Sequence, residues 1–300
     1  MNRYQFMKKL GCIFIFSLFV FNATAQAISI VSRGGSSASD AKTVLDQLNY
    51  RITYDLTFQP SKDTSATQQE KMMLLVGDSI SLFFSQNAFL RDSIMATFQG
   101  DNPDMTRMMA AMQSAPKSMF SYEIIKRTNA QQVVFQENVF MDKLAYAEPL
   151  PAVRWNITTE TATKVGYPCQ KATTTYGGRD YEAWFTFQIP IQDGPYKFSG
   201  LPGLIVEMYD TKNQYHFTLA GLQKASSGEI AVNERKLLKV SKEKFTEMKA
   251  DFAENPFKMI NASGGSITMK TNDGKELSQK EMSNLVKKNQ NKRNNPIELN

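Results

Sequence analysis

Residues 167–189 read YPCQKATTTYGGRDYEAWFTFQI, and this stretch carries the strongest local structural signal of the chain. Two β-prone runs flank Gly177 and Gly178, and a two-residue Gly-Gly loop is typical of a tight hairpin whose turn needs positive φ. The turn fixes the predicted cross-strand pairs as Tyr176 with Arg179, Thr174 with Tyr181, Ala172 with Ala183, and Gln170 with Phe185. The predicted core face of the second strand consists of Tyr181, Ala183, Phe185, Phe187 and Ile189.

The opposite face of this hairpin carries Cys169, Lys171, Asp180, Glu182 and Trp184. Lys171 is predicted to lie across from Trp184, and a cation over an exposed indole contributes about 0.5–1 kcal/mol. Two interpretations stay open. The face is a solvated sheet surface under a loop, or it lines a cavity where Cys169, Lys171 and Trp184 contact a ligand. An isolated thiol with no His nearby in sequence is weak support for a nucleophile.

Residues 194–210 read GPYKFSGLPGLIVEMYD. Pro202 and Gly203 occupy the central places of a predicted type II turn, because Pro presets φ and Gly accepts the positive φ that follows. The residues after the turn are apolar on both faces apart from Glu207, which predicts a central or covered strand. The loop before it is predicted either to pack across the sheet or to contact a ligand through Tyr196, Phe198 and Leu201.

The remaining pattern is also mainly β. Residues 49–58 alternate apolar and polar side chains, as a half-buried strand does, and residues 71–85 form two runs about a turn at Gly77 and Asp78. A helix is predicted from the N-cap Ser241 to Asn255. The expected fold class is mainly β (α+β): a strongly curved antiparallel sheet or unclosed barrel, with a C-terminal helix and a short Met-rich helical or loop insertion.

The Met-rich insertion lies within residues 99–115. Its Met105, Met108 and Met112 could pad a groove for an apolar ligand, or bind copper(I) through their thioethers. Met108 and Met112 stand at helical spacing beside Ala110 and Ala111, which favours ordinary packing or a lid. No metal or cofactor is expected.

The amino end predicts export. Basic residues precede an apolar run from Cys12 to Phe21, and Ala23-Thr24-Ala25 has the small residues of a cleavage site, so residues 1–25 are interpreted as a secretory signal peptide. The apolar run is about a dozen residues, whereas a bilayer span needs about 20. We therefore expect a periplasmic or secreted protein.

The charge distribution argues against a nucleic-acid face. The formal charge of +6 falls to +3 when the signal-peptide cations Arg3, Lys8 and Lys9 are removed. The remaining excess lies in the last residues, where KKNQNKRNNP is polar and aperiodic. Residues 285–300 are therefore expected to form a disordered basic tail. The length of the mature chain predicts a single β-rich domain over residues 26–284.

Cysteine and histidine counts exclude several kinds of site. Without Cys12 the mature chain has only Cys169, so it cannot form an intrachain disulfide, and His216 is its one histidine. A Cys/His zinc site needs more ligands than these two residues supply. There is also no phosphate-binding glycine loop and no dinucleotide fingerprint.

Both quoted stretches resemble the GLPGLI family, secreted Gram-negative proteins named for the motif that stands here as Gly200 to Ile205. The flanking Cys169-x-Lys171-Ala172 and Ala183-Trp184-Phe185 are similar to family members too. The resemblance covers about 60 of 300 residues. It implies an envelope protein of unestablished activity and brings no catalytic residues.

Two functions remain open. The first is non-catalytic binding of an apolar ligand, such as a lipid or acyl chain, or of an outer-membrane or periplasmic protein. The alternative is a periplasmic hydrolase that uses the carboxylates of Asp180, Glu182 and Glu207 with Arg179 or Lys171. The hydrolase predicts that these carboxylates converge within about 5–9 Å in a deep cleft.

Overall fold

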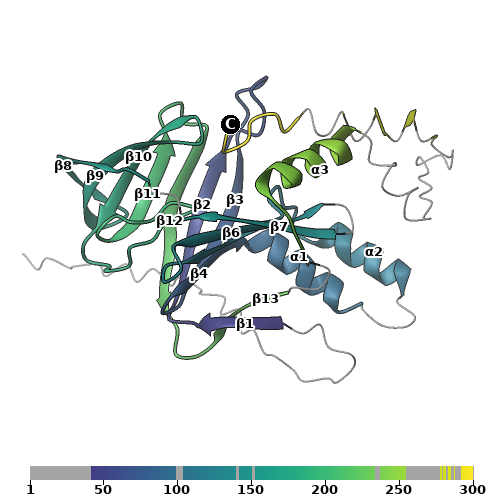
Figure 1. Ribbon diagram of the computed structural model, residues 1–300, viewed down its shortest axis with the longest axis horizontal. Coiled ribbons are helices and arrows are strands. Elements are labelled where there is room, and N and C mark those ends of the chain that lie inside the picture. Colours follow the sequence, from purple (N-terminus) through teal and green to yellow (C-terminus); the bar gives the residue numbers. More distant parts are fainter. Residues whose placement is uncertain are drawn as a thin grey trace, which may run out of the picture. The chain divides into compact units, whose positions relative to one another are not determined.

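The computed structural model describes residues 42–98, 104–139, 142–150, 153–233, 237–254 and 292–299, with single positions between 278 and 287. The fold is mainly β, as predicted, and contains a 12-stranded sheet and a two-stranded sheet (Figure 1). The predicted signal peptide lies outside the described residues. Among the helices that can be described, none is both long and apolar enough to cross a bilayer.

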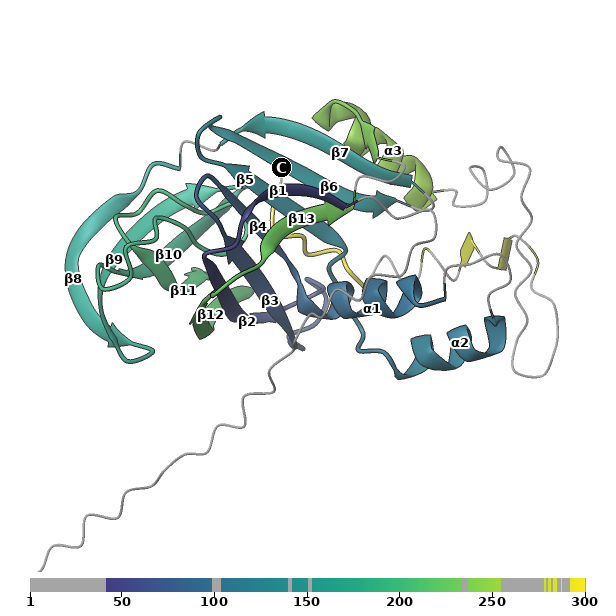
Figure 2. The same cartoon turned by 90° about the horizontal axis from the view of Figure 1, so that it is seen from below.

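The 12-stranded sheet is open, with β14 and β8 as its two edges. In spatial order its strands are β14 (Leu237–Lys239), β7 (Asp142–Pro149), β6 (Gln132–Val139), β5 (Tyr122–Arg127), β4 (Ile80–Ser85), β3 (Gln68–Val76), β2 (Tyr50–Phe58), β12 (Tyr215–Lys224), β11 (Leu204–Asp210), β10 (Arg179–Thr186), β9 (Tyr167–Tyr176) and β8 (Asn156–Lys164). The β14–β7 pair is parallel and the other pairs are antiparallel. Figure 2 shows the strong bend of β8 and β9.

The chain order explains how the sheet is assembled. One run of neighbouring strands goes from β2 to β7 and a second from β8 to β12, and the two runs join where β12 pairs with β2. The predicted alternation in β2 is confirmed, because Ile52, Tyr54 and Leu56 are fully buried whereas Asp55 is exposed. The predicted hairpin about Gly77 is the β3–β4 pair.

The hairpin predicted from residues 167–189 has the expected register, with Tyr176 opposite Arg179 and Gln170 opposite Phe185. Gly177 and Gly178 have φ of 56° and 75°, the positive values that this turn requires. The core-face prediction is wrong for Phe187, whose exposed fraction is 60%. The reason is that β10 ends at Thr186, so the alternation of faces does not continue to Phe187.

The predicted type II turn at residues 201–204 is wrong. Gly203 N donates to Leu201 O at 2.8 Å, which closes a γ-turn around Pro202, and the positive φ belongs to Gly200, at 91°. Gly203 is required for another reason: a Cβ there would lie 2.1 Å from the backbone oxygen of Thr186. The predicted central strand is confirmed, since β11 lies between β10 and β12.

Helix α3 (Lys242–Glu254) confirms the predicted C-terminal helix. Lys244 N donates to Ser241 Oγ at 3.1 Å, and Phe245 is buried against Phe135 and Tyr146. The Met-rich insertion contains α2 (Met105–Ser114), which Asp104 caps. Helix α1 (Gln86–Ala96) was not predicted, because its amino-terminal signal is the single N-cap Ser85 at the end of a β-strand.

The buried apolar side chains form two separate clusters. The larger cluster contains aromatic rings from both runs of strands, among them Tyr54, Phe83, Tyr181, Phe198 and Phe217. The two-stranded sheet, β1 (Lys42–Gln47) with β13 (Glu229–Asn233), contributes Ile230 and Val232 to a smaller cluster that includes residues of β4 and β5.

Candidate functional site

The structure places the predicted ligand-contacting residues in three separate groups. Trp184, Lys171 and Cys169 lie on the face of β9 and β10 opposite Tyr181, and Lys171 is across from Trp184, as predicted. The cation over the indole is nevertheless Lys164, whose Nζ is 5.1 Å from the ring. Lys171 pairs with Glu182 at 3.0 Å and with Glu160 at 3.4 Å.

Cys169 and Trp184 are buried on this face, with exposed fractions of 4% and 7%. Burial raises the pKa of the Cys169 thiol, which keeps it in the less nucleophilic neutral form at neutral pH. These two residues pack with the main apolar cluster. Their position therefore indicates packing on the second face of a bent sheet.

The second group, Tyr196, Phe198 and Leu201, lies in the loop between β10 and β11 and is fully enclosed by the core. Phe198 stacks edge-on against Tyr181 at 4.8 Å. This loop therefore packs across the sheet, which is one of the two alternatives derived from its sequence. Ordered packing of the loop positions Lys197, which sequence reasoning did not single out.

The third group is on α2. Met108 and Met112 are half-buried and neighbouring Met109 is 64% exposed, whereas the side chain of Met105 is outside the described part of the structure. No group of three or more His, Cys, Asp or Glu side chains that could hold a metal occurs among the described residues.

The last residues described by the structure dock against the domain as an extended segment. Residues 294–299, hereafter the C-terminal segment, contact β10, β12, the β9–β10 turn, the β10–β11 loop and the β2–β3 loop. Asn295 and Ile297 have exposed fractions of 2% and 8%. The sequence prediction of a disordered tail does not hold for this part, because its amide, apolar and acidic side chains each find a partner in the domain.

Arg179 is the centre of this contact. Its guanidinium is buried and donates to Asp210 Oδ2 (3.1 Å), Gln214 Oε1 (2.7 Å), Asn295 Oδ1 (2.7 Å), Pro296 O (2.7 Å) and Ile297 O (3.1 Å). All five N–H groups are thereby used, which a buried guanidinium requires. A sequence signal existed: Arg179 stands on the core face together with Tyr181 and Ala183, where a cation must be paired.

Backbone oxygens of the C-terminal segment accept further hydrogen bonds from side chains of the sheet. Tyr215 Oη donates to Asn295 O at 2.6 Å and Tyr181 Oη to Ile297 O at 3.3 Å. The Asn295 side-chain amide donates to Gln59 O at 2.8 Å, and its side-chain oxygen accepts a hydrogen bond from Arg179. The segment is therefore held by its backbone and by the identity of its side chains.

Glu298 extends the contact to a second buried cation. Lys197 is fully buried; its Nζ is 2.8 Å from Glu298 and also pairs with Glu148 of β7. Tyr196 Oη donates to Glu298 at 2.6 Å. Burial by itself would raise the pKa of Glu148. The hydrogen bonds and positive charges of Lys197 and Lys242 outweigh this effect, so the pKa of Glu148 lies below its ordinary value. Both carboxylates are consequently neutralised by lysines.

The loop that carries Lys197 is itself anchored by a buried ion pair. Lys126 of β5 pairs with Asp193 and donates to Gly194 O at 2.9 Å. Desolvation lowers the pKa of Lys126, although the Asp193 charge opposes this change. The pair fixes the start of the loop, and thus the position of Lys197 and Tyr196 under the C-terminal segment. We define the segment site as Arg179, Tyr181, Tyr196, Lys197, Asp210, Gln214 and Tyr215.

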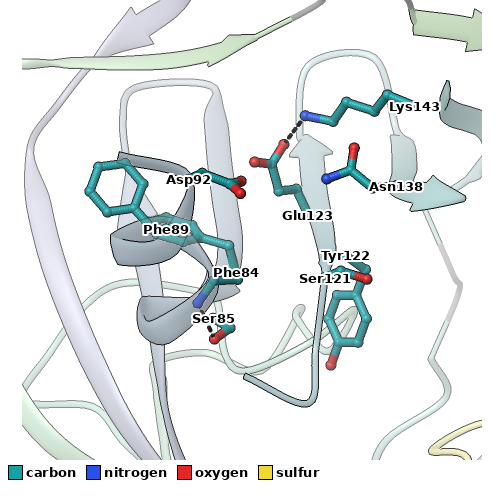
Figure 3. Close-up of a pocket in the computed structure, with 10 residues that line it drawn as sticks. Phe84, Ser85, Phe89, Asp92, Ser121, Tyr122, Glu123, Asn138 and Lys143 are labelled. Atoms are coloured by element: carbon teal, nitrogen blue, oxygen red, sulfur yellow. Dashed lines mark hydrogen bonds and ion pairs between the residues drawn. The ribbon is translucent and has the colours of Figure 1, made fainter. Parts of the chain in front are cut away.

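A small hollow lies elsewhere, beside α1 and β5 (Figure 3). Asp92 and Glu123 approach it, and Lys143 Nζ is 2.8 Å from Glu123. Desolvation, followed by the charge of Glu123, raises the pKa of Asp92. The hollow has a volume of about 10 Å³, which is room for about one water molecule.

The carboxylates of the alternative function do not share a cleft with Arg179. Glu182 pairs with Lys171, and Glu207 contacts Lys164 at 2.6 Å and His216 at 3.1 Å. Asp180 is exposed and accepts a hydrogen bond from Thr175 at 2.6 Å. Arg179 lies on the opposite face of β10 and pairs with Asp210.

The structure thus defines an open, mainly β domain with an internal, highly hydrogen-bonded site for an extended segment. In sequence, a family model described as a protein of unknown function (Porph_ging) matches residues 176–207, which include β10 and the loop carrying Lys197. No curated protein matches the chain.

Two solved structures of PNGF-II, in space groups P21 and C2, are similar in fold. Each is 14% identical and covers 68% of this chain, with a TM-score of 0.46. The chain spans about a third of the length of PNGF-II, since 33% of that chain is covered.

Proposed function

We propose that this chain is an exported cell-envelope protein of the GLPGLI type that binds a polypeptide partner without catalysis. The observation that carries the proposal is the C-terminal segment, which the domain holds as it would hold a peptide ligand. Arg179 alone donates to three consecutive residues of the segment, from Asn295 to Ile297. Peptide recognition through main-chain hydrogen bonds and side-chain pockets is a recurring binding mode.

A polypeptide has more support than a lipid or acyl chain. The aromatic rings of the main cluster pack on one another, for example Phe58 on Phe120 at 4.8 Å and Phe135 on Tyr146 at 5.2 Å. The hollow beside α1 is far below the roughly 300–1,000 Å³ of a typical small-molecule site. The ion pairs of Glu182 with Lys171 and of Glu207 with Lys164 support structural roles for these carboxylates over the acid–base roles of the hydrolase alternative.

The proposal is tested with a full chain whose own segment cannot dock. In Ile297→Asp, a charge replaces a side chain that is 8% exposed, and an unpaired charge is costly to bury. We expect this variant to bind a synthetic peptide with the sequence of residues 292–300 at a one-to-one ratio, measured by isothermal titration calorimetry. The same peptide carrying the Ile297→Asp change should bind at least about 10-fold more weakly, since a buried contact is lost.

Leu299→Asp is the matched control, because Leu299 is 39% exposed and its backbone, not its side chain, bonds to Gly177. This control and the wild type should show almost no binding of micromolar peptide, since a tethered segment competes at an effective concentration on the order of millimolar. A folded Ile297→Asp chain that shows no binding of the wild-type peptide would rule out the proposed function.

A further inference from the structure

We propose that the segment site also accepts the C-terminal segment of a second copy of this chain, so that copies associate by exchanging segments. This inference rests on the proposed function and names the partner of the same site. Exchange of an identical element between protomers is a low-cost route to association, because every contact of the closed form is remade. Exchange requires that the site recognise the segment specifically and that the connection reach a neighbouring copy.

The site distinguishes the side chains of the segment individually. The Asn295 side chain both accepts from Arg179 and donates to Gln59 O. An acid in its place would leave Gln59 O without this donor, and an apolar residue would leave both partners unsatisfied. Ile297 is buried in the main cluster, and Glu298 meets Lys197 and Tyr196. A matching ligand therefore needs an amide, an apolar and an acidic residue in this order.

A second copy carries this sequence by definition. Asn294 adds a further contact outside the segment site, where its side-chain oxygen accepts from Lys62 N at 2.7 Å and its amide donates to Asp63 at 2.8 Å. The residues that bond to the segment belong to the sheet and its loops. They would therefore make the same contacts with a segment supplied by either copy.

The connection is long enough for exchange. Helix α3 ends at Glu254 and the segment begins at Asn294, so 39 residues (255–293) link them. A chain of this length spans at most about 130 Å when extended. That reach exceeds the diameter of a domain of this size, roughly 40 Å from its expected radius of gyration. The segment of one copy can therefore reach the site of a neighbour.

Docking within one copy competes with exchange. A tethered segment acts at an effective concentration on the order of millimolar, so the wild type should be monomeric when dilute. Exchange becomes visible when one copy has an empty site and the other a free segment. Two full-length variants produce this situation.

The first variant, Ile297→Asp, leaves its site empty. The second, Gly177→Asn, is expected to disfavour docking at its own site, because a Cβ at Gly177 would lie 2.9 Å from Glu298 Cγ and 3.2 Å from Glu298 Cα. Asn tolerates the φ of 56° at this position better than most residues do. Gly166→Asn is the matched control, since Gly166 also has positive φ, 82°, but no atom within 4 Å of a Cβ.

The mixture of Ile297→Asp and Gly177→Asn is expected to form a one-to-one complex in native mass spectrometry and sedimentation, while each variant alone stays monomeric. Replacing Gly177→Asn by Gly166→Asn should abolish the complex, because that chain keeps its own segment docked. The complex should also vanish when Gly177→Asn carries Ile297→Asp as well.

A folded mixture that stays monomeric would overturn the exchange. If Ile297→Asp still binds the free peptide, the proposed function survives and only the inference fails. If neither peptide nor second copy binds, both fail. If Ile297→Asp does not fold alone, the experiment uses wild-type chains of two isotopic masses mixed at millimolar concentration. The expected result is heterodimers that dissociate when excess peptide is added. Their absence would contradict exchange.

Discussion

Replacing Arg179 by Met lowers the free energy of unfolding by about 3–5 kcal/mol, the range for removing one partner of a buried ion pair. The substitution leaves the Asp210 carboxylate, which is 1% exposed, without its cation. It also removes donors from Asn295 and from two backbone oxygens of the C-terminal segment. Urea denaturation followed by Trp fluorescence measures the loss.

The control is Arg154→Met, because the Arg154 side chain is exposed. A surface substitution of this kind is expected to change the unfolding free energy by less than about 0.5 kcal/mol. An Arg179→Met chain with nearly wild-type stability would show that the buried guanidinium does not hold the site together.

Gly203→Ala is the second change with a large expected effect, a destabilisation of about 3 kcal/mol, at the upper end of the range for overpacking. The added Cβ would lie 2.1 Å from Thr186 O, a backbone atom that cannot rotate away. The turn that feeds β11 must therefore move away from the end of β10. Thermal unfolding monitored by circular dichroism measures the effect.

Gly221→Ala provides the comparison within the same sheet. The nearest atom to a Cβ at Gly221 is 3.9 Å away, in the side chain of Thr53, which is an ordinary contact. This variant should be at least as stable as the wild type, because a strand glycine costs roughly 0.5–1 kcal/mol of conformational entropy relative to alanine. Equal losses in the two variants would contradict the steric explanation.

Local patterns predicted the β-hairpin well because its information is local. The Gly177-Gly178 loop sets the register, and alternation then assigns Tyr181 and Phe185 to the core. Alternation fails at Phe187, where the end of the strand, not the residue type, decides exposure. Likewise, Gly203 is required by a close approach to Thr186, which a turn rule does not contain.

The candidate site was mostly hidden because its contacts are distant in sequence. Arg179 meets Asn295 across 116 positions, and Lys126 meets Asp193 across 67. The polar composition of the last residues indicates disorder when considered alone. It permits docking only because Arg179 and Tyr215 in the sheet, and Lys197 in the β10–β11 loop, have buried donors that need acceptors. The clearest available signal was Arg179 on a predicted core face.

Amide hydrogen exchange of the wild-type chain tests most directly whether the domain holds its C-terminal segment as a bound peptide. Leu299 N–H donates to Gly177 O at 2.7 Å and Asn295 N–H to Pro60 O at 3.3 Å, and exchange of both requires opening of the site. We predict slow exchange at these two amides in the wild type and in Leu299→Asp, and free-peptide rates in Ile297→Asp. Free-peptide rates at both amides of the wild type would contradict the account.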